Sequence, residues 1–318
     1  MSTFAQMLAD NPFAKDIWQG LQQTPKKLSS RYFYDEAGDQ LFQRIMQMPA
    51  YYLTNCEYEI FTTHRQAILD LLDDAPFDLI ELGAGDGYKT KVLLRHFLAA
   101  GAIFRYLPID ISANALQKLK AELRAELPNL QVEGLAGDYF KMLEQLGGSG
   151  NVRKFILFIG ANIGNLSCEQ AAIFLQRIQQ SMNPGDLLLI GFDLKKDPQL
   201  ILDAYNDPEG ITAAFNLNLL HRINRELGAD FNVDAFSHWE TYNPVSGATK
   251  SYLISRAAQH VQLFGQCIAF EAWEAIDVEL SLKYSLPDIE ALASTAGFRI
   301  RQHFTDRRNF FIDTIWQK

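Results

Sequence analysis

The sequence predicts an α/β fold, a doubly wound parallel sheet with a second, smaller α+β domain. Between Phe77 and Asp193, short apolar runs alternate with helical patterns, which is typical of repeated βαβ units. The length of 318 residues, at roughly 150 per domain, allows one large domain or two modest ones. Because strand-like patterns gather again after residue 233, we expect the sheet domain at 61–197 and 284–318 and the second domain at 1–60 and 198–283.

Five apolar runs are the predicted strands of the parallel sheet, and helical patterns fill the gaps between them. The clearest helix repeats leucine at helical spacing over 116–127, with Ser112 as its N-cap and Pro128 just past its end. The predicted strands are 77–82, 103–109, 130–135, 154–159 and 186–192.

The rest of the chain has a different pattern. About 60 residues of mixed pattern precede the sheet, and 201–228 has the periodicity of two helices. An insertion of this size beside the strand ends is where we expect a substrate pocket. Beyond it we predict strands at 252–255, 261–264 and 276–282, a helix at 287–296, and two further strands at 298–304 and 309–316.

The composition and charge of the chain exclude several classes of protein. Ordinary counts of 20 Gly and 11 Pro, with 22 Phe and 12 Tyr, rule out a disordered or collagen-like chain. With 29 Lys and Arg against 38 Asp and Glu, the net charge of −9 opposes binding to a nucleic-acid backbone. No run of about 18 apolar residues and no secretion signal is present, so we expect a cytoplasmic protein with no membrane contact.

Neither the cysteines nor the histidines have the spacing of a structural or metal site. Cys56, Cys168 and Cys267 lie far apart in the sequence, so we predict reduced, buried thiols and no disulfide framework. The six histidines are scattered without ligand spacing, so we predict no metal.

The strongest local signal is a glycine-rich turn, Gly83-Ala-Gly85-Asp-Gly87, directly after the first predicted strand of the sheet. Glycines at this place let the backbone approach a ligand closely. The third glycine comes one position too early for the dinucleotide-binding fingerprint. The turn therefore predicts a ligand other than a classical dinucleotide.

Two further motifs follow at the ends of the next strands. Asp110 is placed to accept hydrogen bonds from ribose hydroxyls, and Asp138 with Tyr139 is suited to hold an adenine ring. Taken singly, such residues often form tight loops, helix caps or turns. All three motifs in order look like the class I S-adenosylmethionine-dependent methyltransferases. Lys89 either contacts the methionyl carboxylate of that cofactor or lies on a solvated helix face.

Further segments spread over nearly the whole chain match one family. They are 32–35, 38–42, 49–52 with Thr54 and Glu57, 164–166, 194–198, 204–205, 215–216, 224–236 and 279–281. With these segments the chain resembles the histidine N-alpha-methyltransferases of ergothioneine biosynthesis. The resemblance implies a class I methyltransferase domain that transfers three methyl groups from S-adenosylmethionine to the α-amine of L-histidine, which gives hercynine. We expect a monomer.

The resemblance also implies the roles of individual residues. It assigns the cofactor to Gly83, Lys89, Asp110, Asp138 and Tyr139, the amine and carboxylate end of histidine to Tyr51, Gly160, Asn165 and Tyr205, and the imidazole ring to Glu279 and Ser281. Two positions depart from the family pattern. Asn162 stands where a Thr or Ser is expected, and Tyr139 is more usually Phe.

Physical reasoning about the same residues leads to the same site. On a strand, Glu279 and Ser281 point to one face, where a carboxylate and a hydroxyl suit the two nitrogens of an imidazole. Taken alone, such a pair is more often a solvated face. Asn165 is equally placed to cap the helix that follows it, and Tyr51 and Tyr205 are equally suited to packing.

Methyl transfer from a sulfonium is an in-line displacement, so positioning of the amine is expected to supply most of the rate. We expect Tyr34, Tyr51 and Asn165 to orient the amine while water takes the proton, because a phenol with a pKa of about 10 is a poor base. Two alternatives stay open at this point, a related methyltransferase for another amino acid or aromatic amine and a non-enzymatic S-adenosylmethionine sensor.

Overall fold

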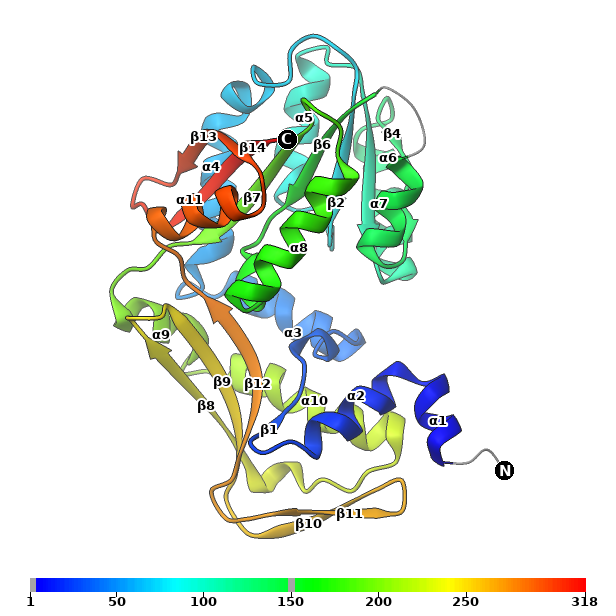
Figure 1. The fold of residues 1–318 in the computed structure, drawn as a ribbon, viewed down its shortest axis with the longest axis vertical. Helices are drawn as coiled ribbons and strands as arrows, with labels where there is room; N and C mark the ends of the chain where they lie inside the picture. The colour runs from blue at the N-terminus through cyan, green and yellow to red at the C-terminus, as the bar shows by residue number, and fades with distance from the viewer. Residues whose placement is uncertain (1–3, 148–151) are drawn as a thin grey trace. The chain divides into compact units, whose positions relative to one another are not determined.

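The computed structural model describes residues 4–147 and 152–318, and the chain divides into two compact units. Unit 1 comprises Met1–Tyr52 and Lys196–Ser281, and unit 2 comprises Leu53–Lys195 and Leu282–Lys318 (Figure 1). Each unit is thus built from two separated stretches of sequence. The expected boundary between residues 60 and 61 falls inside the continuous helix α4 (Tyr52–Leu69), whereas the division lies at the start of that helix.

Unit 2 contains the predicted doubly wound sheet, in the order β13-β14-β7-β6-β2-β3-β4, with β5 also paired to β3. The strands from β2 to β7 pair in parallel, whereas β14 lies antiparallel between β13 and β7. The strands are β2 (Phe77–Leu82), β3 (Phe104–Asp110), β4 (Gln131–Val132), β5 (Leu135–Ala136), β6 (Arg153–Phe158), β7 (Leu187–Asp193), β13 (Arg299–Thr305) and β14 (Phe311–Gln317). The α/β class predicted from the sequence is confirmed.

The strands form where the apolar runs predict them because the sheet is covered on both faces. All residues of β2 and β7 are buried, as expected for central parallel strands. The run predicted at 130–135 is instead two short strands, β4 and β5, separated by Glu133 and Gly134. Both pair with β3, at the edge of the sheet.

Helices cover the two faces of this sheet, with α8 and α11 on the near face in Figure 1 and α4 and α5 on the far face. The predicted N-cap is confirmed, since Ser112 Oγ accepts a hydrogen bond from Ala115 N. The helices of unit 2, besides α4, are α5 (Thr90–Ala99), α6 (Ala113–Glu126), α7 (Tyr139–Gly147), α8 (Cys168–Ser181) and α11 (Leu286–Thr295).

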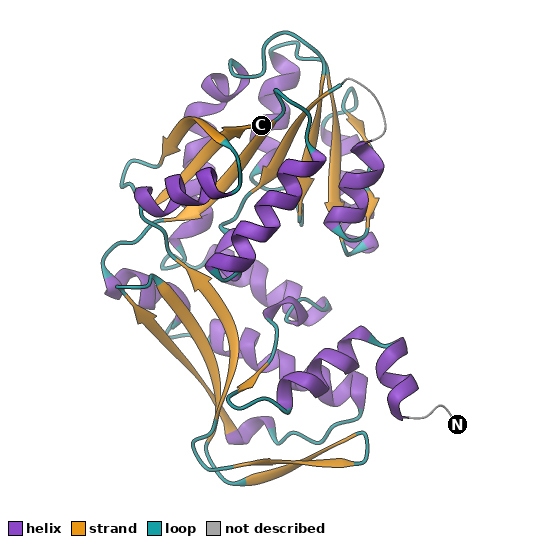
Figure 2. Ribbon diagram, in the orientation of Figure 1, coloured by secondary structure: helices purple, strands orange, loops and turns teal. Residues whose placement is uncertain are grey.

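Unit 1 is an α+β structure whose sheet has the order β1-β12-β9-β8, with the hairpin β10-β11 beside it (Figure 2). Its strands are β1 (Lys26–Lys27), β8 (Phe236–Asn243), β9 (Ala248–Ser255), β10 (Gln259–Leu263), β11 (Gln266–Phe270) and β12 (Ala275–Leu282). Its helices are α1 (Phe4–Asp10), α2 (Pro12–Leu21), α3 (Glu36–Gln47), α9 (Pro198–Tyr205) and α10 (Ile211–Leu227). The two helices predicted over 201–228 are therefore present, while β8 and β11 were not predicted.

The core of unit 1 fills the space between its helices and its sheet. Phe13 and Ile17 of α2 and Phe215 and Leu219 of α10 pack in one cluster with Leu253 of β9. A helix that places apolar residues on one face gains stability by burying that face against such a sheet.

The expectation of buried cysteines is correct for Cys56 and wrong for Cys168 and Cys267, which are exposed. Cys168 is the first residue of α8, and Cys267 lies in the hairpin strand β11, so neither belongs to an inward face. Burial raises the pKa of the Cys56 thiol to about 11. Separately, none of the helices within 4–147 and 152–318 is long and apolar enough to cross a membrane.

Candidate functional site

The glycine-rich turn follows β2 and has the conformation that only glycine adopts readily. Gly83, Gly85 and Gly87 have φ values of +77°, +52° and +63°. A β-carbon at Gly83 would lie 2.8 Å from the hydroxyl of Tyr139, whereas the space beside Gly85 is open for 4 Å. The turn therefore leaves its backbone accessible to a ligand.

Asp110, at the end of β3, lies against this turn. Its Oδ2 accepts a hydrogen bond from Gly85 N at 3.3 Å, and its Oδ1 accepts one from Ser112 N at 2.9 Å. A carboxylate has about four acceptor positions, so these contacts orient the group and leave capacity for a ligand's hydroxyls. The structure thus places Asp110 against the turn that contains Gly83, another of the predicted cofactor residues.

Tyr139 is the first residue of α7, and Asp138 directly precedes it. Asp138 Oδ1 accepts hydrogen bonds from Phe140 N at 3.1 Å and Lys141 N at 3.3 Å, so this carboxylate stabilises the start of the helix. The Tyr139 hydroxyl faces Gly83. Burial, together with the nearby carboxylates of Asp110 and Asp138, raises the pKa of Tyr139 to about 12, which keeps its phenol protonated.

Lys89 does not lie on a solvated helix face. Its ammonium pairs with the carboxylate of Glu57 from α4, which is fully buried at 0% exposure. Gly160 N donates to both oxygens of that carboxylate, at 2.8 and 3.0 Å. Glu57 had no predicted role. An acid between the buried residues Leu53, Ile60 and Phe61 on one helix face is the sequence signal that points to it.

Asn165 lies at the end of the short helix η2 (Asn162–Asn165) that follows Gly160. It does not cap the next helix, because Ser167 is the N-cap of α8 and forms a capping box with Gln170. Asn165 is exposed, so its side chain is accessible to a ligand. The unusual Asn162 donates to Ile159 O at 2.9 Å and so stabilises the loop.

In unit 1, the predicted imidazole residues are held by hydroxyl groups. Ser251 Oγ of β9 donates to Glu279 Oε2 at 2.9 Å, and the hydroxyls of Tyr205 and Ser281 lie 3.0 Å apart. Ser251 is 1% exposed and was not predicted, because its role depends on pairing of two strands far apart in sequence. Glu279 and Ser281 thus lie on one face of β12, as the strand periodicity predicts.

The three predicted tyrosines of unit 1 belong to one aromatic cluster. The Tyr51 ring contacts that of Tyr205 edge to face, with centroids 6.2 Å apart, and that of Phe42 at 6.3 Å. Tyr34, 44% exposed, contacts Phe42 and Phe215 at 5.5 Å each. These contacts fix the planes of the rings. A tyrosine ring can pack in this way while its hydroxyl binds a ligand, so the two predicted roles are compatible.

His238 of β8 is a further titratable group beside this cluster. Its Nε2 lies 3.2 Å from the carbonyl oxygen of Tyr205 and 3.9 Å from Glu240 Oε2. Burial lowers the pKa of His238, so the imidazole is neutral near pH 7. The sequence contained no signal for it, because an isolated histidine on a strand has no distinctive pattern.

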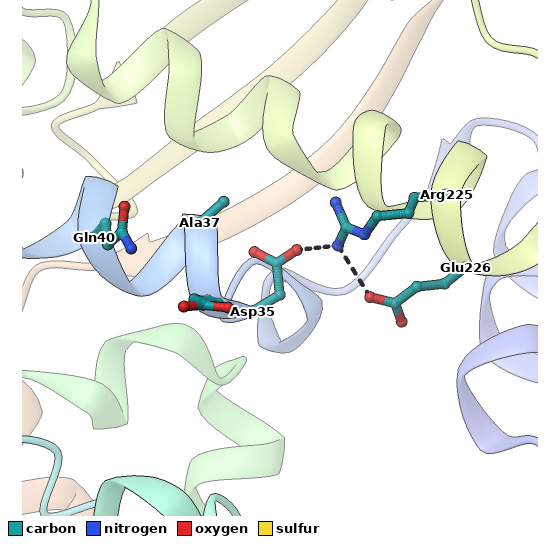
Figure 3. A pocket seen from close by; sticks show the side chains of 6 residues that line it. Asp35, Ala37, Gln40, Arg225 and Glu226 are labelled. Atoms are coloured by element: carbon teal, nitrogen blue, oxygen red, sulfur yellow. Dashed lines mark hydrogen bonds and ion pairs between the residues drawn. The ribbon is translucent and has the colours of Figure 1, made fainter. Parts of the chain in front are cut away.

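A hollow of about 490 Å³ in unit 1 lies between the start of α3 and the end of α10 and contains none of the predicted site residues (Figure 3). Figure 3 shows Arg225 between the carboxylates of Asp35 and Glu226, the latter at 3.1 Å. Arg225 is thus paired with two of the three acidic residues that line the hollow, so the lining keeps a negative charge. The lining residues are Asp35, Glu36, Ala37, Gln40, Arg225 and Glu226.

The predicted site residues fall into two groups. Those assigned to the cofactor lie at the carboxyl ends of the strands of unit 2, together with Gly160 and Asn165. Those assigned to the imidazole, and the three tyrosines, lie in unit 1. Carboxyl ends of parallel strands are the usual place for a ligand in a doubly wound sheet.

The chain is similar to proteins of one family over most of its length. The family model described as "Histidine-specific methyltransferase, SAM-dependent" matches residues 13–318. Histidine N-alpha-methyltransferase of Mycolicibacterium smegmatis is 36% identical over 92% of this chain and 90% of that protein, and its namesake of Mycobacterium tuberculosis is 34% identical over 93% and 92%. Ergothioneine biosynthesis protein 1 of Neurospora crassa is 32% identical over 86% of this chain, which spans 31% of that protein.

Both the fold and the matched length lead to one conclusion. Unit 2 has the sheet of the class I S-adenosylmethionine-dependent methyltransferases, and the family match extends through both units. The chain belongs to the family of S-adenosylmethionine-dependent, histidine-specific methyltransferases.

Proposed function

We propose that this enzyme transfers three methyl groups to the α-amine of L-histidine, which gives hercynine, the trimethylated product. The observation that carries the proposal is the polar group on β12, where Glu279 is held by Ser251 and Ser281 by Tyr205. A fixed carboxylate and a fixed hydroxyl on one face suit the two ring nitrogens of histidine. The name histidine N-alpha-methyltransferase supports the α-amine as the methylated position, and the name ergothioneine biosynthesis protein 1 supports a product that serves ergothioneine biosynthesis.

The residues at the strand ends of unit 2 fit S-adenosylmethionine, which supplies an electrophilic methyl group on a sulfonium when bound. The open turn at Gly85 allows close approach of the ligand to the backbone, and the Asp110 carboxylate accepts from ribose hydroxyls. Asp138 and Tyr139 flank the adenine, with the phenol of Tyr139 protonated and able to donate. Lys89 attracts the carboxylate of the methionyl end.

The amine end of histidine is assigned to residues that bind and orient it. Gly160, Asn165, Tyr51 and Tyr205 hold the amine and carboxylate, and Tyr34 and Tyr51 direct the lone pair. Because near-attack geometry of about 3–3.5 Å between reacting atoms supplies roughly 7–11 kcal/mol of a barrier, no strong base is required. Water accepts the amine proton, since unperturbed phenols near pH 7 are poor bases.

Product analysis tests the proposal. The purified protein is incubated with S-adenosylmethionine and an equimolar mixture of the twenty amino acids, and methylated products are identified by mass spectrometry. We expect trimethylated histidine, with monomethyl and dimethyl forms at early times. A product from another amino acid, or a reaction that stops after one or two methyl groups, would contradict the proposal, and absence of any turnover would favour a sensor.

A further inference from the structure

The carboxylate of Glu57 is the centre of a buried polar cluster in unit 2. It pairs with the Lys89 ammonium, and it accepts the Gly160 amide on both oxygens, at 2.8 and 3.0 Å. Lys89 is the N-cap residue of α5, the helix after the glycine turn, and Gly160 follows β6. One side chain on α4 therefore connects two loops at the carboxyl edge of the sheet.

The sheet beneath this carboxylate makes room for it. Gly191 of β7 pairs in register with Asp313 of β14. A β-carbon at Gly191 would lie 2.5 Å from Glu57 Oε1, so only glycine leaves space there. The Glu57 carboxylate can therefore occupy this position only because Gly191 has no side chain.

The charges of the cluster are balanced only when one of its acids carries a proton. Glu57 and Asp313 are both 0% exposed, and Lys89 is the cation beside them. Burial, and next the nearby Glu57 carboxylate, raise the pKa of Asp313 well above its ordinary value, while Lys89 opposes this. The raised pKa favours the protonated form of Asp313, so the Glu57 carboxylate is the acid that pairs with the Lys89 ammonium.

A buried ion pair contributes little net stability, because removing both charges from water offsets their attraction. Its value here is geometric. Lys89 has three N–H donors, and Glu57 takes one, while the lysine side chain keeps 17% exposure. The ammonium is held at one point and still accessible to a ligand's anionic group.

We propose that Glu57 is a positioning residue of the cofactor site, which holds the Lys89 ammonium and the Gly160 loop where the α-carboxylate of the methyl donor binds. The proposal rests on the assignment of Lys89 to that carboxylate. Without the Glu57 charge, the half-buried ammonium loses its counter-ion, so it either releases its proton or turns toward water. In both cases the donor that the ligand's carboxylate requires is lost.

A double-mutant cycle tests this role. Binding of S-adenosylhomocysteine is measured by calorimetry for the wild type, Glu57→Gln, Lys89→Met and the double variant. We expect Glu57→Gln to weaken binding by about 10- to 100-fold in the wild-type background, the range for one charge-assisted hydrogen bond. In the Lys89→Met background the same change is expected to weaken binding less than about twofold, since Glu57 acts through Lys89.

Steady-state kinetics give a readout that a purely structural role would not produce. Glu57→Gln is expected to raise KM for S-adenosylmethionine while kcat at saturation and KM for histidine stay near their wild-type values. The matched control is Glu59→Gln on the same helix, because Glu59 is a partly exposed acid paired with Arg307 at 3.3 Å. It is expected to leave all these quantities unchanged.

Each other outcome has a definite meaning. If Glu57→Gln lowers the melting temperature but leaves the affinity unchanged, or weakens binding equally in both backgrounds, Glu57 does not act through Lys89 and the proposal is wrong. If Lys89→Met binds S-adenosylhomocysteine normally, the assignment of Lys89 fails, and the wild-type product assay still judges the proposed reaction separately. Should Glu57→Gln not fold, Glu57→Asp replaces it in the same cycle with the same criteria. This variant keeps the negative charge but moves it away from Lys89, because the side chain is one methylene shorter.

Discussion

Glu81, the residue two positions before Gly83, is a buried acid with neutral hydrogen-bond donors. It is 1% exposed and accepts from Thr90 Oγ1 at 2.7 Å and from the Tyr106 hydroxyl. Burial raises the pKa of Glu81 from 4.5 to about 7, although both hydrogen bonds oppose this. The carboxyl group is therefore protonated more readily in the folded than in the unfolded chain.

This difference predicts a pH-dependent stability. The protonated Glu81 carboxyl favours the folded state. This contribution to the free energy of unfolding is complete below the pKa of the unfolded chain, 4.5, and it is lost as the pH rises through about 7. Glu81→Gln mimics the protonated acid, so the stability of the wild type relative to this variant is expected to fall by about 2–3 kcal/mol between pH 4.5 and pH 8. Urea unfolding at a series of pH values measures the difference, with the exposed Glu144→Gln as control. Parallel curves for the wild type and Glu81→Gln would contradict the assigned pKa.

The place of a residue at a strand end or on a strand face is visible in a single sequence. Asp110 ends β3 and Glu279 lies on β12, as the pattern predicts, while their ligand roles stay predictions, and that of Glu279 rests on the family resemblance. Glu57 and Ser251 were not given a role, because each acts on a partner far away in the chain, Lys89 and Glu279. Such pairs depend on tertiary packing, which a single sequence does not display.

Among the elements, α3 depends strongly on its N-cap residue, Asp35. Asp35 Oδ1 accepts from Gly38 N and from Asn218 Nδ2 of α10, both at 2.8 Å, and Arg225 pairs with Oδ2. Burial opposes the charge, yet these hydrogen bonds together lower the pKa of Asp35 below its usual range. One carboxylate thus caps α3 and ties it to α10.

Removing this carboxylate should weaken unit 1. Asp35→Ala is expected to destabilise the protein at pH 7 by about 1–3 kcal/mol, mostly through the lost N-cap, because the partly exposed ion pair adds little. Asp35→Asn keeps a capping oxygen and should cost less. Because the pKa of Asp35 is lowered, its charge stabilises above the unfolded pKa of 3.8, and the gap between wild type and Asp35→Asn should close as the pH falls below it. A constant gap in thermal melts from pH 3 to pH 7 would contradict this account.

Elements with a strong period or a long apolar run were predicted, and weakly patterned ones were not. The strand β8 was missed because only two of its eight residues, Phe236 and Glu240, are buried. By contrast, β2, β6 and β7 are almost entirely buried and were visible as apolar runs. Burial on both faces produces a signal that half-exposed strands lack.

At the scale of the whole molecule, the assigned cofactor and imidazole residues lie in different units. Asp110→Ala is expected to weaken binding of S-adenosylhomocysteine by about 1.5–3 kcal/mol and to leave histidine affinity intact. Glu279→Ala is expected to weaken histidine by roughly 2–5 kcal/mol and to leave S-adenosylhomocysteine affinity intact. Calorimetry with each ligand alone measures both. Loss of both affinities in either variant would show that the two sites are not separate.

The change of pattern after residue 198 led us to expect a sheet domain at 61–197 and 284–318. The two units divide at 195/196 and 281/282, within two residues of the expected junctions, and at 52/53, eight residues before the expected one. Helix α4 carries the polar residue Glu57 toward Lys89 and Gly160 of unit 2, and nothing in its periodicity says which unit it packs against. Packing partners, more than local propensity, decide where such a helix belongs.

The antiparallel insertion of β14 beside β7 has a consequence for how the protein is made. A ribosome completes β7 before it has synthesised 196–281, and β14 comes only after that. Until then one edge of a strand that is entirely buried in the finished protein stays open and able to pair with another chain. The nascent chain is therefore exposed to aggregation until residues 194–317 have been synthesised, so slowing translation over 196–281 should reduce the soluble yield even when the sequence is unchanged.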